Sequence, residues 1–190
     1  QPLQAAETIS LTTVDGTARG GKDYENNTFF VKAPIGSTSI KVDGIEILGD
    51  VIFEKDEVFF LKVFDTEAFD TEKSRPQGTI TISDDDSPPS LKISDATNFE
   101  MNKLNFIVTA EKVSEVDIVV NFTTEDLSDA TPDKDYDSNS GQVILNAGSL
   151  STEVLIFAPY DKIDENQETF GVRITSPTPN ICLLYTSPSP

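Results

Sequence analysis

Residues 54–64 read Glu-Lys-Asp-Glu-Val-Phe-Phe-Leu-Lys-Val-Phe, an acidic segment that runs directly into alternating apolar side chains. Residues 165–175, Glu-Asn-Gln-Glu-Thr-Phe-Gly-Val-Arg-Ile-Thr, repeat this order. Alternation with a period of two predicts a β-strand with one buried face, and enrichment in Phe, Val, Ile and Thr supports the prediction. Because solenoid repeats have periods of roughly 20–50 residues, two copies about 110 residues apart indicate tandem domains instead.

A second acidic motif occurs at matched places in the two halves of the chain. Lys22-Asp23-Tyr24 precedes the first acidic segment, and Lys134-Asp135-Tyr136 precedes the second. A run of three aspartates, residues 84–86, follows the alternating residues 79–83. Carboxylates that recur on the loops of two β domains predict a site for a hard cation, and Ca²⁺ is the usual ion.

Further alternating segments predict the fold class. They are separated by Gly, Asp, Asn and Pro and occupy residues 79–83, 105–109, 117–123 and 169–174. Short strands between such loops predict an all-β fold of two tandem immunoglobulin-like antiparallel β-sandwiches. Pro88 and Pro89 interrupt the strand pattern, since proline cannot donate to a sheet ladder. We therefore predict one domain over residues 1–87 and a second over residues 88–181.

The last nine residues predict a different origin. Residues 182–190, Cys-Leu-Leu-Tyr-Thr-Ser-Pro-Ser-Pro, match the peptide that a transposase sequencing adapter would encode. We therefore interpret residues 182–190 as an adapter-derived artefact. On this hypothesis Cys182, the single cysteine of the chain, has no biological role.

Composition excludes several classes of function. The chain has 33 acidic and 14 basic residues and a net charge of −19, which argues against nucleic-acid partners and anionic membrane surfaces. It has no histidine, so histidine-based triads and histidine-ligated zinc are excluded. The sequence contains no apolar stretch of about 18 residues, the length that would predict a membrane-spanning helix. A glycosidase with two carboxylates is the enzyme alternative, but the chain has no tryptophan for sugar stacking. We expect no enzymatic activity.

The order of these motifs resembles the Calx-beta family. The first repeat matches at residues 15–18 (Asp-Gly-Thr-Ala), 21–24 (Gly-Lys-Asp-Tyr), 54–59 and 79–86. The second matches at residues 135–136, 161 and 165–170, but residues 128–132 (Ser-Asp-Ala-Thr-Pro) replace the glycine-rich turn. The resemblance implies that both sandwiches are truncated: the first begins near its third strand, and the second ends before its last strand.

The resemblance also implies the calcium ligands. In the first repeat they are Asp23, Asp50, Glu54, Glu57, Asp84, Asp85 and Asp86, with the carbonyl of Ile52. In the second repeat the matched positions are Glu100, Asp135, Asp161, Glu165 and Glu168. Lys162 follows Asp161 and disfavours a dense cation cluster there. The residue 129–135 segment is not an EF-hand loop, because it contains a proline and lacks the glycine of the sharp turn.

The function that follows is a non-enzymatic, calcium-binding tandem module of a larger cell-surface or membrane protein. Calcium would rigidify the loops and the linker between repeats, in an adhesion or stalk role outside the cell. Its partners would be calcium ions, neighbouring repeats of the same chain and other cell-surface proteins. Two alternatives remain: regulatory calcium-sensor domains in the cytosolic loop of a sodium/calcium exchanger, and a metal-free structural spacer.

Overall fold

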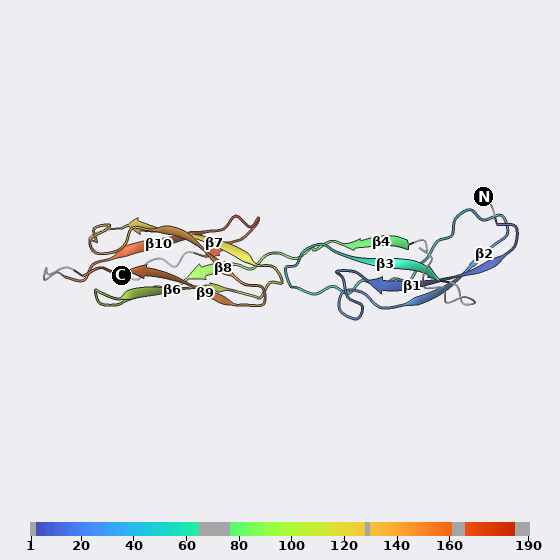
Figure 1. Cartoon of the computed structure of the whole chain (residues 1–190), viewed down its shortest axis with the longest axis horizontal. Helices are drawn as coiled ribbons and strands as arrows, with labels where there is room; N and C mark the ends of the chain where they lie inside the picture. Colours follow the sequence, from blue (N-terminus) through green and yellow to red (C-terminus); the bar gives the residue numbers. More distant parts are fainter. Residues whose placement is uncertain (1–2, 65–76, 128–129, 161–165, 185–190) are drawn as a thin grey trace. The chain divides into compact units, whose positions relative to one another are not determined.

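The computed structural model describes residues 3–64, 77–127, 130–160 and 166–184. Over these ranges every named element is a β-strand (Figure 1). The chain divides into two compact units, Gln1–Asp50 with Lys55–Asp84 and Val51–Glu54 with Asp85–Pro190. No helix in the described part of the chain is long and apolar enough to cross a membrane. The prediction of an all-β fold with antiparallel sheets is confirmed.

The first unit is built on one four-stranded antiparallel sheet. Its strand order is β2-β1-β3-β4. The strands are β1 (Glu7–Asp15), β2 (Thr28–Ala33), β3 (Glu57–Phe64) and β4 (Gln77–Ile82). The register places Asp15 opposite Phe59 and Phe59 opposite Ile80. The last residue of β1 and the first residues of β3 therefore lie at the same end of the sheet.

The core of the first unit lies at this end. Ala18, Tyr24 and Phe59 are fully buried, and Ile45, Ile80 and Ile82 pack against them. The Tyr24 and Phe59 rings stack with their centroids 3.9 Å apart. Because Tyr24 belongs to a loop and Phe59 to β3, this stack fixes the loop against the sheet.

The second unit is a sandwich of two sheets. One sheet has the order β10-β7-β8 and the other β11-β5-β6-β9. The strands are β5 (Leu91–Ile93), β6 (Lys103–Ala110), β7 (Ile118–Asp126), β8 (Ser140–Leu145), β9 (Ser151–Phe157), β10 (Phe170–Thr175) and β11 (Leu183–Leu184). Neighbouring strands are antiparallel except β11 and β5, which are parallel.

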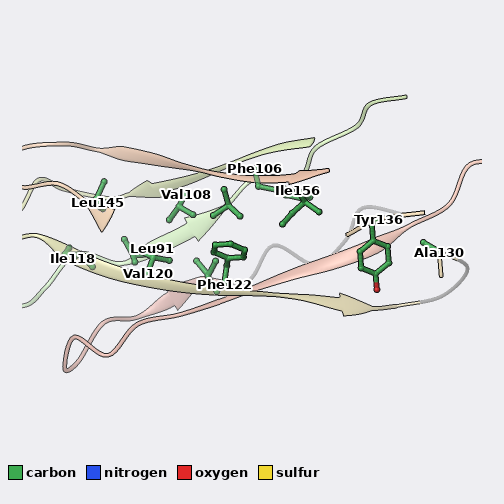
Figure 2. Close-up of a cluster of buried hydrophobic side chains, with 13 residues drawn as sticks. Leu91, Phe106, Val108, Ile118, Val120, Phe122, Ala130, Tyr136, Leu145 and Ile156 are labelled. Carbon is green, nitrogen blue, oxygen red and sulfur yellow. The ribbon is translucent and has the colours of Figure 1, made fainter. Parts of the chain in front are cut away.

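Alternation along the strands builds the core of this sandwich. Figure 2 shows 13 buried apolar side chains between the two sheets. Phe106 and Val108 of β6 face this core, as do Ile118 and Val120 of β7, while the residues between them are more exposed. The period of two thus gives each strand a buried and an outer face, as an alternating sequence predicts.

The strand predictions are confirmed at each alternating segment. Residues 59–64, 79–82, 105–109, 118–123 and 170–174 lie in β3, β4, β6, β7 and β10. Ser83, Asp117 and Thr169, at the ends of three predicted segments, lie just outside the strands. The domain limits of 1–87 and 88–181 stay predictions. Leu183 and Leu184 pair with Leu91 and Lys92, and residues 185–190 lie outside the described part. The adapter origin of residues 182–190 also stays a prediction.

Candidate metal centre

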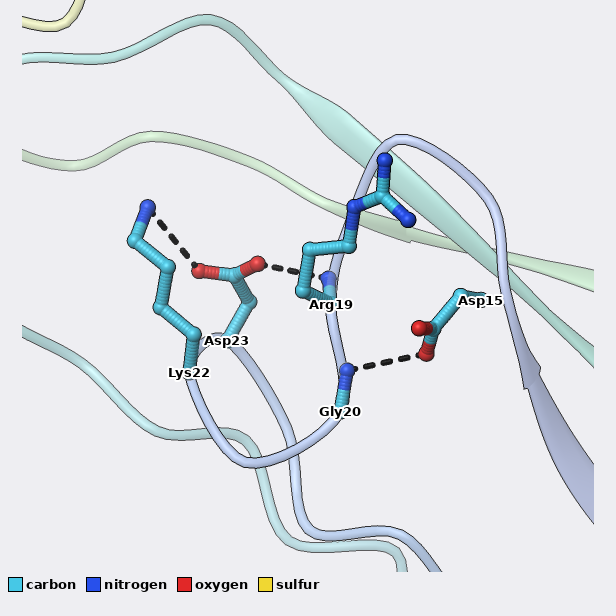
Figure 3. A network of polar contacts seen from close by, with 5 residues as sticks. All are labelled: Asp15, Arg19, Gly20, Lys22 and Asp23. Carbon is cyan, nitrogen blue, oxygen red and sulfur yellow. Dashed lines mark hydrogen bonds and ion pairs between the residues drawn. The ribbon is translucent and has the colours of Figure 1, made fainter.

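A tight turn after β1 positions the first predicted ligand. The Asp23 N–H donates to the Arg19 carbonyl (2.9 Å), and the Gly21 N–H donates to the Tyr24 carbonyl (2.7 Å). The Asp23 carboxylate closes the turn, because its Oδ2 accepts the Arg19 N–H at 2.6 Å (Figure 3). Asp23 is buried, with 7% of its surface exposed. Gly21 has φ +83°, a backbone conformation that glycine adopts without strain.

Asp15 holds the other side of the same turn. Its Oδ1 accepts the Gly20 N–H at 2.9 Å and the Tyr24 hydroxyl at 2.5 Å. These bonds stabilise the carboxylate, so the Tyr24 hydroxyl first and the Gly20 N–H second lower the pKa of Asp15. Burial and the hydrogen bond to Asp15 raise the pKa of Tyr24 to about 12. Asp15 was not among the predicted ligands, and the structure assigns it to the turn.

The glycine-rich segment before the turn attaches the turn to β3. The Val58 N–H donates to Thr17 Oγ1 (2.8 Å), and the Ala18 N–H donates to the Val58 carbonyl (3.0 Å). A Cβ on Gly16 would lie 2.3 Å from the Val58 carbonyl oxygen, so this approach requires glycine. Thr17 and Gly16 thereby hold Glu57, the residue before Val58, near the Asp23 turn. Sequence reasoning used this segment as a family marker and missed its positioning role.

Three predicted ligands meet where the turn and β3 come together. One carboxylate oxygen each from Asp23, Glu54 and Glu57 lies within 4.8 Å of the others. Asp23 is buried and the two glutamates are half-buried. Carboxylate oxygens are the ligands that Ca²⁺ prefers, and gathered carboxylates repel one another unless a cation is present. The donor set therefore fits a hard divalent cation.

The other predicted ligands of the first repeat are not part of this group of three. Asp50 and Asp85 are exposed, and Ile52, Asp84 and Asp86 are half-buried. The Asp84 N–H donates to Asp56 Oδ1 at 3.1 Å, just after the end of β4. Asp56 was not predicted to have a role, and here it holds the beginning of the aspartate run. The wider ligand set stays a prediction.

The second repeat rebuilds the turn. The Asp135 N–H donates to the Thr131 carbonyl (3.0 Å), and Asp135 Oδ2 accepts the Thr131 N–H (2.5 Å). The Tyr136 ring stacks on Phe170 with centroids 4.1 Å apart. Burial, then the charges of Asp126 and Asp133, raise the pKa of Tyr136. Both tyrosines pack beside their turns.

The predicted ligands of the second repeat are partly outside the described residues. Asp161 and Glu165 fall there. Glu100 is exposed, and Glu168 and Asp135 are half-buried. Among the residues that the structure describes, the cluster of carboxylates with metal-ligand spacing consists of Asp23, Glu54 and Glu57. A metal site in the second repeat stays a prediction.

Comparison with known proteins identifies the family. The family model of the Calx-beta domain matches residues 1–86 and 89–186. The chain belongs to the Calx-beta family and contains two copies of its domain in tandem.

The sodium/calcium exchanger Calx of Drosophila melanogaster is 24% identical to this chain over 173 residues. That match covers 89% of this chain and 18% of the exchanger, so the chain spans under a fifth of that relative's length. Two solved structures are also similar. CBD12 from CALX1.2 has 23% identity and a TM-score of 0.43, over 92% of this chain and 69% of that one. The calcium binding domain CBD12 of CALX1.1 has 23% identity and a TM-score of 0.40 over the same shares.

Proposed function

We propose that this chain is a non-enzymatic pair of calcium-binding Calx-beta domains that regulates a membrane transporter of the sodium/calcium exchanger type. The single observation that carries the proposal is the group of Asp23, Glu54 and Glu57 oxygens within 4.8 Å of one another. Similarity to the Drosophila exchanger Calx supports the exchanger setting. This setting was the alternative at the sequence level, and it is now preferred to the adhesion or stalk role.

The chemistry of the site follows from its three carboxylates. Ca²⁺ takes six to eight oxygens at about 2.3–2.6 Å, so three carboxylates supply part of the shell. Asp50, the Ile52 carbonyl and Asp84, Asp85 and Asp86 are the proposed further ligands. Asp23 Oδ2 would keep the hydrogen bond that it accepts from the Arg19 N–H while Oδ1 binds the ion, so the turn is already formed before an ion arrives. Metal binding would join the turn to the loop that contains Glu54 and to the first residue of β3.

The regulatory effect would come from ordering these segments. A ligand that binds the folded domain alone stabilises it, by about 2.7 kcal/mol at a hundred times the dissociation constant. We place the domains in a cytosolic loop, where a change in calcium would change the rigidity of the module. Calcium and the neighbouring repeat are the proposed partners.

Calorimetric titration of the whole chain with Ca²⁺ tests the proposal. We expect saturable heat that is lost in the double variant Glu54→Gln, Glu57→Gln, in which neutral amides replace two carboxylates of similar shape. The matched control is Glu100→Gln with Glu168→Gln, which removes two predicted ligands of the second repeat. Circular dichroism verifies that each variant is folded. Wild-type protein without heat at millimolar calcium would favour the metal-free spacer.

A further inference from the structure

A lysine ammonium lies close to Asp23, one of the three clustered carboxylates. Lys22 Nζ is 3.5 Å from Asp23 Oδ1, and the two side chains are 45% and 9% exposed (Figure 3). The other carboxylate oxygen of Asp23, Oδ2, accepts the Arg19 N–H. A divalent cation that approaches Asp23 must therefore compete with the ammonium for Oδ1.

We propose that Lys22 is a counter-ion built into the chain, which offsets the charge of the carboxylates in calcium-free protein and lowers the affinity for calcium. This inference rests on the proposed function and concerns the same site. Asp23, Glu54 and Glu57 repel one another when no cation is present, and Lys22 brings a positive charge to the most buried of the three. The chain has only 14 basic residues against 33 acidic ones, so positive charge at this position is not a general property of its surface.

The competition follows from charge and from the freedom of the lysine side chain. An ammonium and a divalent cation that share one carboxylate repel each other, and the effect is modest near solvent because water screens it. The Lys22 side chain is half-exposed, so it can turn towards water when the cation binds. We therefore expect removal of the charge to tighten calcium binding about threefold to tenfold, in line with a partly screened charge pair.

The test compares four proteins with the complete chain. They are the wild type, Lys22→Gln, Lys22→Arg and Lys41→Gln. Lys41 is the matched control, since its ammonium pairs with Asp43 at 2.6 Å, its side chain is 84% exposed, and its loss changes the net charge equally. Two quantities are measured: the calcium dissociation constant by calorimetry, and the thermal midpoint in the presence of a chelator.

Lys22→Gln should bind calcium more tightly than the wild type and melt at a lower temperature with chelator. Lys22→Arg and Lys41→Gln should resemble the wild type in both. An unchanged affinity in Lys22→Gln would overturn the proposal. If the wild type binds no calcium, the proposed function fails separately, and the chelator midpoint decides the counter-ion role: an equal midpoint in Lys22→Gln and Lys41→Gln overturns it.

Discussion

The two units contain the same turn on cores of different size. Gly21 and Asp133 occupy the same position, and both have positive φ, +83° and +62°. The N–H of each donates to the carbonyl of the following tyrosine, at 2.7 Å and 2.8 Å. The core of the second unit has 13 buried side chains, and Ala130 and Tyr136 of the turn lie at one end of this group (Figure 2). The corresponding buried group in the first unit has three members, with three half-buried residues beside it.

This comparison separates the structural role of the Asp-Tyr motif from the metal-binding role that we propose for it. Asp23 and Asp135 both accept the N–H four residues earlier, at 2.6 Å and 2.5 Å. The shared role of the aspartate is therefore to close the turn. A cluster of three carboxylates forms where two glutamates also approach the aspartate, as Glu54 and Glu57 approach Asp23. The motif alone predicts the turn, and residues from other segments decide which carboxylates lie beside it in the first repeat.

The largest expected effect is at the stacked phenylalanines. Phe59→Ala should destabilise the first unit by about 3–5 kcal/mol, because Phe59 is fully buried in a small core. Phe170→Ala should cost less, about 2 kcal/mol, since Phe170 is half-buried at the margin of a larger core. Hydrogen exchange measured separately for the amides of each unit checks both values. Equal losses would show that core size does not distinguish the two units.

The second effect is calcium itself. At a hundred times its dissociation constant, calcium should stabilise the first unit by about 2.7 kcal/mol. The second unit should gain less, because Asp23 and Glu57, two of the three clustered carboxylates, belong to the first unit. Hydrogen exchange with calcium and with chelator measures the difference. Equal protection of both units would contradict this expected difference and indicate a calcium site in the second repeat.

The third effect concerns the tyrosine hydroxyls. Tyr24→Phe removes the hydrogen bond to Asp15 and should cost the first unit about 1 kcal/mol at neutral pH. Because the folded pKa of Tyr24 is raised from 10.0 to about 12, the hydroxyl stabilises the fold below pH 10. That stabilisation is lost as the pH rises towards 12. Thermal midpoints from pH 8 to 12 should show a smaller decline in Tyr24→Phe, with Tyr136→Phe as the control for a hydroxyl on a stacked ring.

The smallest effect is at the shared left-handed position. Gly21→Ala should destabilise the first unit by about 1 kcal/mol, because a side chain at φ +83° strains the backbone while its Cβ meets no atom. Asp133→Gly should change stability by less than about 0.5 kcal/mol. Relief of strain at φ +62° is offset by loss of the Ser138 N–H bond to Asp133 and by a more flexible unfolded chain. Urea unfolding measures both variants, and a large gain in Asp133→Gly would contradict this balance.

Much of the fold could be predicted because alternation is a local property. The residues around Phe59, Phe106, Val120 and Ile174 place an apolar side chain at every second position, and all lie in strands. The sequence also predicted that Asp23 lies on a loop, because the Asp-Tyr motif recurs at Asp135 in the second repeat. The hydrogen bonds that Thr17 accepts from the Val58 N–H and Asp15 accepts from the Tyr24 hydroxyl were not predicted, since each joins segments that only the fold brings together.

The sequence by itself determined the all-β class, the duplication and the list of acidic candidates. These follow from patterns within a few residues and from the repetition of those patterns. The tertiary structure decided which acids meet. Glu54 and Glu57 are more than thirty residues from Asp23 in the chain, and they approach it because β1 pairs with β3 and Thr17 bonds to Val58. Carboxylate spacing depends on strand register and loop closure, which no local pattern specifies.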